Sequence, residues 1–392
     1  MTGRGVRSSS GGEAQLEVGL REAAASAARL LEPRSLGVLC RRPVADEDCP
    51  EASDVDLLSI WDRPDEHPER IAVGGPTGRV FVDVLWVPVS KMIDPAEAAS
   101  YKILPHLVID SDVLWLRSDS VGRIVEGIRD SAYGRAVWER RLGNQLGFGD
   151  AALEEARQNL DFPPAVLFYL QTAHSYFAMA LADGLGRSIA SILTKPMGRL
   201  RQMAAETGTD VDRALEANLR LGRRDPSASL EALDRVYGAV SAACSPRRVQ
   251  GVGARARGHY EYTISPLELE YRKSVARALM ARGEGANAEL YIRFWAYSLS
   301  RCPVVLREAS EGKNPSFYVP FGRFRESLQA ACPEIVEDVG AIMGGGVSTE
   351  EAEESIEGTA AFRRAVVGAL GERGLRVPSV SHGEARPDPG DP

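Results

Sequence analysis

The chain has 392 residues, of which 44% are apolar, and a formal net charge of −8. This length suggests two or three domains, and the apolar fraction is enough for sizeable cores. The acidic balance argues against a coat of nucleic acid along the whole chain, although it allows a local basic patch.

The cysteines and the apolar runs indicate the compartment. The cysteines, at positions 40, 49, 244, 302 and 332, show no C-x-x-C spacing. They fit a reducing cytoplasm and neither a disulfide framework nor a zinc site. The chain has no apolar run of about 18 residues, and its N-terminus lacks the apolar core of a secretion signal. We therefore expect a cytoplasmic protein without a membrane partner.

Strand and helix patterns divide the chain into two parts. In chain order they predict a Gly/Ser-rich disordered tail at 1–12, a helix at 13–31, and strands at 35–40, 54–61 and 79–87, with polar or Pro/Gly-rich loops at 41–52 and 62–77. The rest is predicted to be helical, with helices at 165–183, 231–244, 267–282, 288–301 and 323–331 and a loose tail at 377–392. Pro196 is expected to interrupt one helix. Ser348 and Glu351 predict a capping box that opens the last helix, which reaches about residue 371.

Three carboxylates fall in or beside two of the predicted strands. Asp54 and Asp56 are two residues apart, so in a strand they point to the same face. Asp83 lies in the middle of the apolar run 80–86, where an unpaired charge is costly. Convergence of the three would call for cations, and a pair of Mg²⁺ ions would neutralise them and also bind a triphosphate. The alternative is that the Asp-x-Asp pair lies in a solvated turn.

This order of elements resembles the nucleotidyltransferase superfamily typified by DNA polymerase beta, and it looks most like the aminoglycoside and lincosamide nucleotidyltransferase branch. The run 104–110, read as a late strand ending at Asp110, and a helix at 121–129 add to the resemblance. It implies an α+β protein: an N-terminal nucleotidyltransferase α/β domain with a mixed sheet at 13–130, followed by an all-helical region at 131–376 with a break near 245–260.

The resemblance implies that Asp54, Asp56 and Asp83 are the catalytic metal ligands for two Mg²⁺ ions, with an NTP as substrate. The family carries a Gly-Ser pair after the first strand, and this chain has Cys40, Arg41 and Arg42 there instead. Cys40 would stand in the place of the serine, and the arginines would meet phosphate; otherwise the nucleotide site is altered or lost. Ser53 would bond a phosphate or satisfy the backbone.

The implied activity is Mg²⁺-dependent transfer of a nucleoside monophosphate, AMP by default, to a hydroxyl of a small molecule, in antibiotic modification or natural-product biosynthesis. Transfer to tRNA or protein, as in toxins, is a less favoured alternative that would use the Arg-rich loop 247–257 as its RNA contact. A non-catalytic binding protein is a further alternative, and the family allows a homodimer. No general base is assigned; the candidates, each alternatively a solvated surface charge, are Asp110, Asp112, Glu154 and Glu155.

Overall fold

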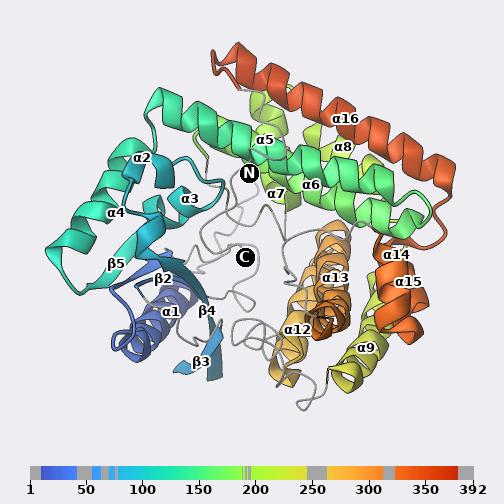
Figure 1. Ribbon diagram of the computed structural model, residues 1–392, viewed down its shortest axis with the longest axis horizontal. Coiled ribbons are helices and arrows are strands. Elements are labelled where there is room, and N and C mark those ends of the chain that lie inside the picture. The colour runs from blue at the N-terminus through green and yellow to red at the C-terminus, as the bar shows by residue number, and fades with distance from the viewer. Residues whose placement is uncertain are drawn as a thin grey trace, which may run out of the picture.

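The computed structural model describes residues 10–41, 55–62, 70–75, 78–187, 189, 192, 196–244, 263–311 and 323–377. Figure 1 shows a small sheet with its helices at one end of the molecule and a larger assembly of helices at the other. Among the described residues, no helix combines the length and the apolar character needed to cross a membrane.

The sheet has five strands in the order β3-β4-β2-β1-β5. Their bounds are β1 Gly37–Arg41, β2 Val55–Trp61, β3 Arg70–Gly75, β4 Gly78–Pro88 and β5 Ser111–Leu116. Strands β2 and β4 are parallel, and the other neighbouring pairs are antiparallel. The sheet is therefore mixed, and the predicted α+β fold class, with an all-helical region after the sheet, is confirmed.

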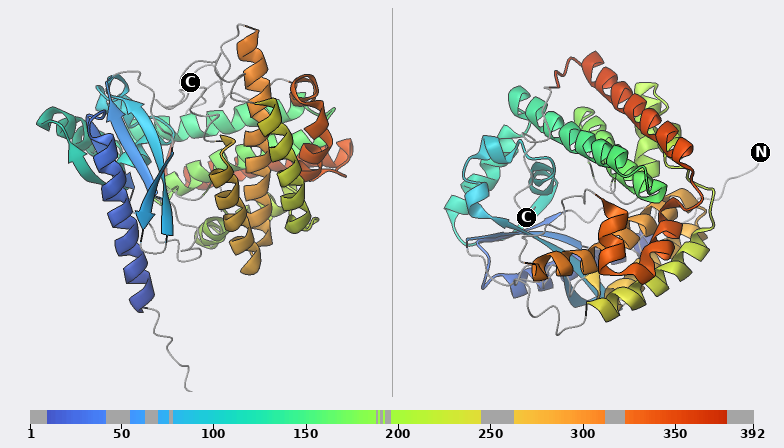
Figure 2. Two further views of the ribbon diagram at one scale, coloured as in Figure 1. Left: turned by 90° about the horizontal axis from the view of Figure 1, so that it is seen from below. Right: turned by 45° about the vertical axis from the view of Figure 1, so that its right-hand side comes forward.

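Each face of the sheet packs against a different set of helices. Helix α1 (Ser10–Leu31) covers one face, where its small apolar residues such as Ala23 and Ala27 pack against Leu57 and Val84. The opposite face packs against α2 (Pro95–Ala98), α3 (Leu104–Ile109) and α4 (Asp119–Ser131) through a second buried cluster that includes Leu58. Figure 2 shows α1 running beside the strands. Because side chains alternate along a strand, the two faces carry different residues of β2.

The structure differs from the sequence-based prediction at the last strand of the sheet. The run 104–110, predicted to be a strand, forms α3, and the last strand of the sheet is β5, which follows it. Pro105 sits in the first turn of α3, where its missing N–H costs nothing. A short apolar run cannot be assigned to strand or helix by periodicity alone. Strand β3 also lies within the segment predicted to be a Pro/Gly loop.

The helical region follows the predicted pattern in most places. Its helices are α5 Arg135–Gln158, α6 Pro163–Gly184, α7 Pro196–Thr207, α8 Val211–Asn218, α9 Pro226–Ala243, α12 Pro266–Ala281, α13 Gly285–Ser310, α14 Phe324–Ala331, α15 Val336–Gly344 and α16 Thr349–Glu372. Pro196 begins α7 and does not interrupt a helix, so that prediction was wrong. The capping box of Ser348 and Glu351 at the start of α16 is confirmed.

Buried apolar side chains of the helical region form one cluster between Leu142 and Leu370. The two clusters of the sheet lie between Leu20 and Ala132. This distribution is what the predicted domain boundary near residue 130 would produce; the boundary itself stays a prediction.

A buried arginine, held by an ion pair within the helical region, joins the two parts. Arg141 in α5 is fully buried and donates to both carboxylate oxygens of Asp183 in α6, at 2.6 Å and 2.9 Å. Its Nη1 also donates to the carbonyl oxygens of Ala99 and Ala132, each at 2.9 Å. Since Ala99 and Ala132 lie beside α2 and α4, the guanidinium fixes the sheet's helices to the helical region.

Candidate functional site

Two of the three predicted carboxylates lie next to each other on the sheet. In the parallel pair β2 and β4, Asp56 is the direct partner of Asp83, so both side chains leave the same face. This face is the one that also carries Leu58, on the side of α3. Asp54 directly precedes β2 and lies outside the described residues, as do Ser53 and Arg42.

Both carboxylates open into one cavity of about 250 Å³. It is lined by Arg41, Asp56, Leu57, Leu58, Asp83, Leu85, Ile103, Leu107 and Ser111. The cavity is thus a pair of carboxylates and one guanidinium set against an apolar wall from α3 and the chain before it.

Arg41 supplies the cation of this cavity. Its Nη1 lies 3.5 Å from Oδ2 of Asp56, and the two side chains are 19% and 42% exposed. A half-exposed pair of this kind is held weakly, because water screens it. The guanidinium can therefore turn toward an incoming phosphate, to which it is well matched in shape. Of the two described residues predicted to contact phosphate, Cys40 and Arg41, the structure brings Arg41 to the carboxylates.

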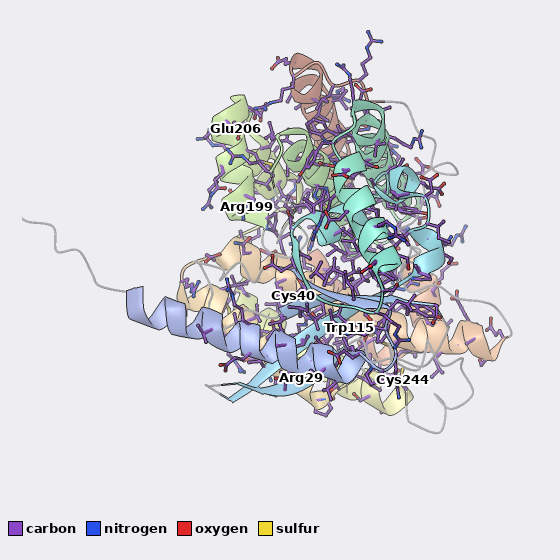
Figure 3. All side chains as sticks on the ribbon, turned by 90° about the vertical axis from the view of Figure 1, so that its left-hand side faces the viewer. Arg29, Cys40, Trp115, Arg199, Glu206 and Cys244 are labelled. Carbon is purple, nitrogen blue, oxygen red and sulfur yellow. The ribbon has the colours of Figure 1, made fainter. Side chains whose placement is uncertain are left out.

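Cys40 lies on the other face of the sheet. It pairs with Leu57, is 5% exposed, and packs in the cluster that contacts α1. Figure 3 shows Cys40 and Trp115 close to α1, on which Arg29 is labelled. Burial raises the pKa of its thiol to about 12, and the charges of Asp56 and Asp112 add to this shift. The structure therefore does not bring Cys40 to the carboxylates, and its thiol is protonated at neutral pH.

The candidates for a general base do not line the cavity. Asp110 ends α3, and Asp112 pairs with Cys40 on β5, so its side chain shares the face of Cys40. Glu154 and Glu155 lie in α5, where Glu154 forms an ion pair with Arg157 at 3.2 Å and burial raises the pKa of Glu155. Among the described residues, the carboxylates that line the cavity are those of Asp56 and Asp83.

Two buried histidines pack against groups outside the cavity. His106 in α3 is buried, with Nε2 at 3.3 Å from Oδ2 of Asp183. His174 in α6 is buried, with Nε2 at 3.0 Å from Oγ1 of Thr359 and 3.2 Å from Nδ2 of Asn218. Neither histidine lines the cavity.

The donor set of the cavity suits a hard divalent cation. Within the described residues no group of three or more His, Cys, Asp or Glu side chains is positioned to hold a metal ion. However, Mg²⁺ is commonly held by one or two protein carboxylates together with substrate phosphates and water. Neighbouring strands are about 4.8 Å apart, so Asp56 and Asp83 can share one ion. The two described carboxylates therefore fit Mg²⁺.

Several residues of the cavity were not predicted from the sequence. Ile103, Leu107 and Ser111 come from α3 and its flanks, which were read as a strand. No spacing in the sequence connects these residues to the carboxylates, because the contact depends on how α3 packs over the sheet. The loop 247–257, considered as an RNA contact, lies outside the described residues.

Comparisons with known proteins add little to this geometry. No protein-family model matches the chain, and no curated protein matches it. Among solved structures, the chain is similar to a nucleotidyltransferase-like protein from Exiguobacterium sibiricum 255-15, with 13% sequence identity and a TM-score of 0.29. That similarity covers 85% of this chain and 89% of the other. A TM-score this low supports no conclusion about the site, so its function has to be inferred from the residues themselves.

Proposed function

We propose that the chain is a Mg²⁺-dependent nucleotidyltransferase that moves a nucleoside monophosphate, AMP by default, from an NTP to a hydroxyl of a small molecule. The observation that carries this proposal is the placement of Asp56 and Asp83 as direct partners on one face of the sheet, in a cavity that also contains Arg41. The resemblance of the element order to the nucleotidyltransferase superfamily supports it.

In this reaction the protein acts mainly by stabilising negative charge and does not need to form a covalent bond with the substrate. The acceptor hydroxyl gives its proton to water and its oxygen forms a bond to the α-phosphorus, the bond from that phosphorus to the bridging oxygen breaks, and pyrophosphate leaves with the electron pair. Mg²⁺ bound at the carboxylates would offset the charge on the attacking and leaving oxygens. Asp56 and Asp83, with Asp54 as the predicted third ligand, would hold the ions, and Arg41 would hold a phosphate.

The apolar lining of the cavity bears on which acceptor can bind beside the carboxylates. Leu85, Ile103 and Leu107 form an apolar surface beside the carboxylates. We assign a small hydroxylated acceptor to this side, as in antibiotic modification or natural-product biosynthesis. No described residue favours RNA as the acceptor.

The experiment is a transfer assay with α-labelled ATP against a panel of hydroxylated metabolites, comparing the wild type with Asp83→Asn. This change removes a metal ligand's charge at nearly constant volume, and we expect turnover to fall at least about 100-fold, or about 2.7 kcal/mol in barrier height. Asp119→Asn is the matched control, because Asp119 lies in the first turn of α4 and outside the cavity. Turnover of Asp83→Asn within about tenfold of the wild type would show that the metal site is assigned wrongly.

A further inference from the structure

A second and larger cavity lies in the helical region, where arginines surround a run of three glycines. Its volume is about 610 Å³. It is lined by Leu167, Arg220, Arg223, Arg224, Asp225, Ala228, Ser229, Ala232, Arg235, Glu289, Arg293, Ala341, Ile342, Gly344, Gly345, Gly346 and Val347. We call it the arginine cavity. It lies among α9, α13 and α15, and Figure 1 shows α9 and α15 at the opposite end of the molecule from the sheet.

Three of the five arginines have their charge balanced at the rim. Arg220 pairs with Glu354, Arg223 with Glu351 and Arg235 with Asp338, each with an N···O distance of 2.6 Å. All three carboxylates lie outside the lining. These pairs hold the arginines in place and leave the charge of the interior to the remaining lining groups.

The interior carries an excess of positive charge. Arg293 is 1% exposed and forms an ion pair with Glu289. Glu289 also accepts a hydrogen bond from the backbone N–H of Gly222 at 2.9 Å. Arg224 donates to the carbonyl oxygen of Ala341, and no carboxylate of the described residues pairs with it. Two guanidinium groups thus face one buried carboxylate, that of Glu289.

The two interior guanidinium groups act on each other. Burial lowers the pKa of Arg293, Glu289 opposes this shift, and the charge of Arg224 lowers the pKa further. The exposed Asp225 also lines the cavity, but its Oδ1 accepts the backbone N–H of Ser227 at 2.9 Å as the cap of α9. Asp225 keeps its negative charge, but among the described residues it forms no ion pair with Arg224, so the guanidinium of Arg224 can pair with a bound anion.

Unused hydrogen-bond donors line the same cavity. Nε of Arg293 is buried and has no hydrogen-bond partner among the described residues. The backbone N–H of the exposed Gly346, which also lines the cavity, makes no backbone hydrogen bond within the described residues. An unsatisfied buried donor costs about 1–3 kcal/mol, so Nε of Arg293 favours a ligand that brings acceptor oxygens.

The three glycines allow the chain to pass close to the arginines. Gly344 and Gly346 have φ of 132° and 87°, a region that favours glycine. A Cβ on Gly344 would lie 2.5 Å from Cδ1 of Leu167, and one on Gly345 would lie 3.0 Å from Nη2 of Arg224. The run 344–346 thus forms a wall of the cavity with no side chains.

We propose that the arginine cavity binds the phosphate group of a small phosphorylated molecule, with Arg224 as its main cationic ligand. A phosphate brings the negative charge and the acceptor oxygens that the interior lacks, and a guanidinium matches it in a forked geometry. The volume of 610 Å³ leaves room for more than the phosphate itself. This site is independent of the carboxylate cavity and of the proposed transfer reaction.

The test is calorimetry without divalent ions, using inorganic phosphate, pyrophosphate and AMP as probes on the full chain. The wild type should bind at least one probe with a dissociation constant below about 5 mM, and Arg224→Gln should weaken that binding at least about tenfold. Arg224→Lys keeps the charge but loses the fork, so its affinity should lie between the two. AMP binding more tightly than phosphate would identify a nucleotide as the source of the group.

Two further variants keep the test decisive. Arg213→Gln removes the same charge from an 81% exposed side chain in α8, outside the cavity, and should leave the affinity within about twofold of the wild type. Gly345→Ala should weaken binding by displacing Arg224, with the far-ultraviolet circular dichroism and the melting temperature checked in every variant. Absence of binding by the wild type, or equal affinities of the wild type and a folded Arg224→Gln, would overturn the proposal.

Discussion

Replacing Arg141 with methionine removes the charge that joins the sheet's helices to the helical region. Asp183 is 1% exposed, and besides Arg141 it accepts a hydrogen bond from Nε1 of Trp138 at 3.1 Å. Burial by itself would raise the pKa of the Asp183 carboxyl, but His106 and Arg141 more than offset this and hold it well below its ordinary value. At pH 7 the variant therefore keeps a buried carboxylate without its guanidinium partner.

The expected cost follows from this geometry. Breaking one side of a buried pair destabilises a protein by about 3–5 kcal/mol. For 392 residues unfolding together, an entropy of about 2.1 cal/mol/K per residue gives about 0.8 kcal/mol/K, so the melting temperature should fall by about 4–6 °C. Calorimetry and denaturant unfolding at pH 7 measure both quantities.

A double-mutant cycle separates the ion pair from simple loss of packing. Asp183→Asn alone leaves Arg141 buried without its counter-charge, whereas Arg141→Met with Asp183→Asn removes both charges. The double variant should be at least about 2 kcal/mol more stable than the sum of the two single effects predicts. Additive effects, or a cost below about 1 kcal/mol for Arg141→Met, would refute the view that the pair with Asp183 holds the guanidinium that connects the two parts.

Two other predictions concern buried residues of the helices. Burial lowers the pKa of His174 to about 3 in the folded protein, whereas it is about 6.5 in the unfolded chain. Between these two pH values the unfolded chain therefore binds a proton that the folded protein does not. The stability that the neutral His174 contributes is present above about pH 6.5 and is lost as the pH falls. Between pH 7 and pH 5 the free energy of unfolding of the wild type should fall by about 2 kcal/mol more than that of His174→Gln. Equal decreases in the two proteins would contradict the burial argument. Gly149→Ala places a Cβ 2.3 Å from the ring of the buried Phe177 and should destabilise by at least about 1 kcal/mol in denaturant unfolding, although alanine favours a helix. Gly238→Ala in α9 has no neighbour within 4 Å and should stabilise by up to about 1 kcal/mol; the reverse order of these two glycine variants would contradict the packing of α5 on α6.

Much of the sheet could be predicted because its strands alternate or are continuously apolar. The pattern around Asp56 and Asp83 predicted two strands, and these strands are direct neighbours. The pairing itself was not readable from either strand alone, since register depends on contacts across the sheet. The resemblance of the whole element order supplied that step.

The sequence failed where local signals were weak or conflicting. The run 104–110 contains Val108 and Ile109, which favour a strand, yet Pro105 begins a helix there and the packing of α3 over the sheet decides the outcome. Cys40 was expected at the phosphates because it stands in the place of a serine in sequence order. The register of β1 against β2 pairs it with Leu57, and the alternation of side chains therefore turns it toward α1.

The arginine cavity shows the same limit on a larger scale. The residues that line it lie as far apart in the chain as Leu167 and Val347, so no local sequence motif could have predicted that they come together. The sequence offered one local signal, the triple glycine at 344–346. Its meaning depends on the approach of Arg224, which is a property of the fold.

The central claim is that Asp56 and Asp83 together hold Mg²⁺ for a nucleotide. The most direct measurement is calorimetry of ATP binding with and without Mg²⁺, on the wild type and on Asp83→Asn. We expect Mg²⁺ to strengthen ATP binding to the wild type at least about tenfold and to have little effect on the variant. The same affinity with and without Mg²⁺ in the wild type, or an unchanged Mg²⁺ effect in Asp83→Asn, would contradict the account.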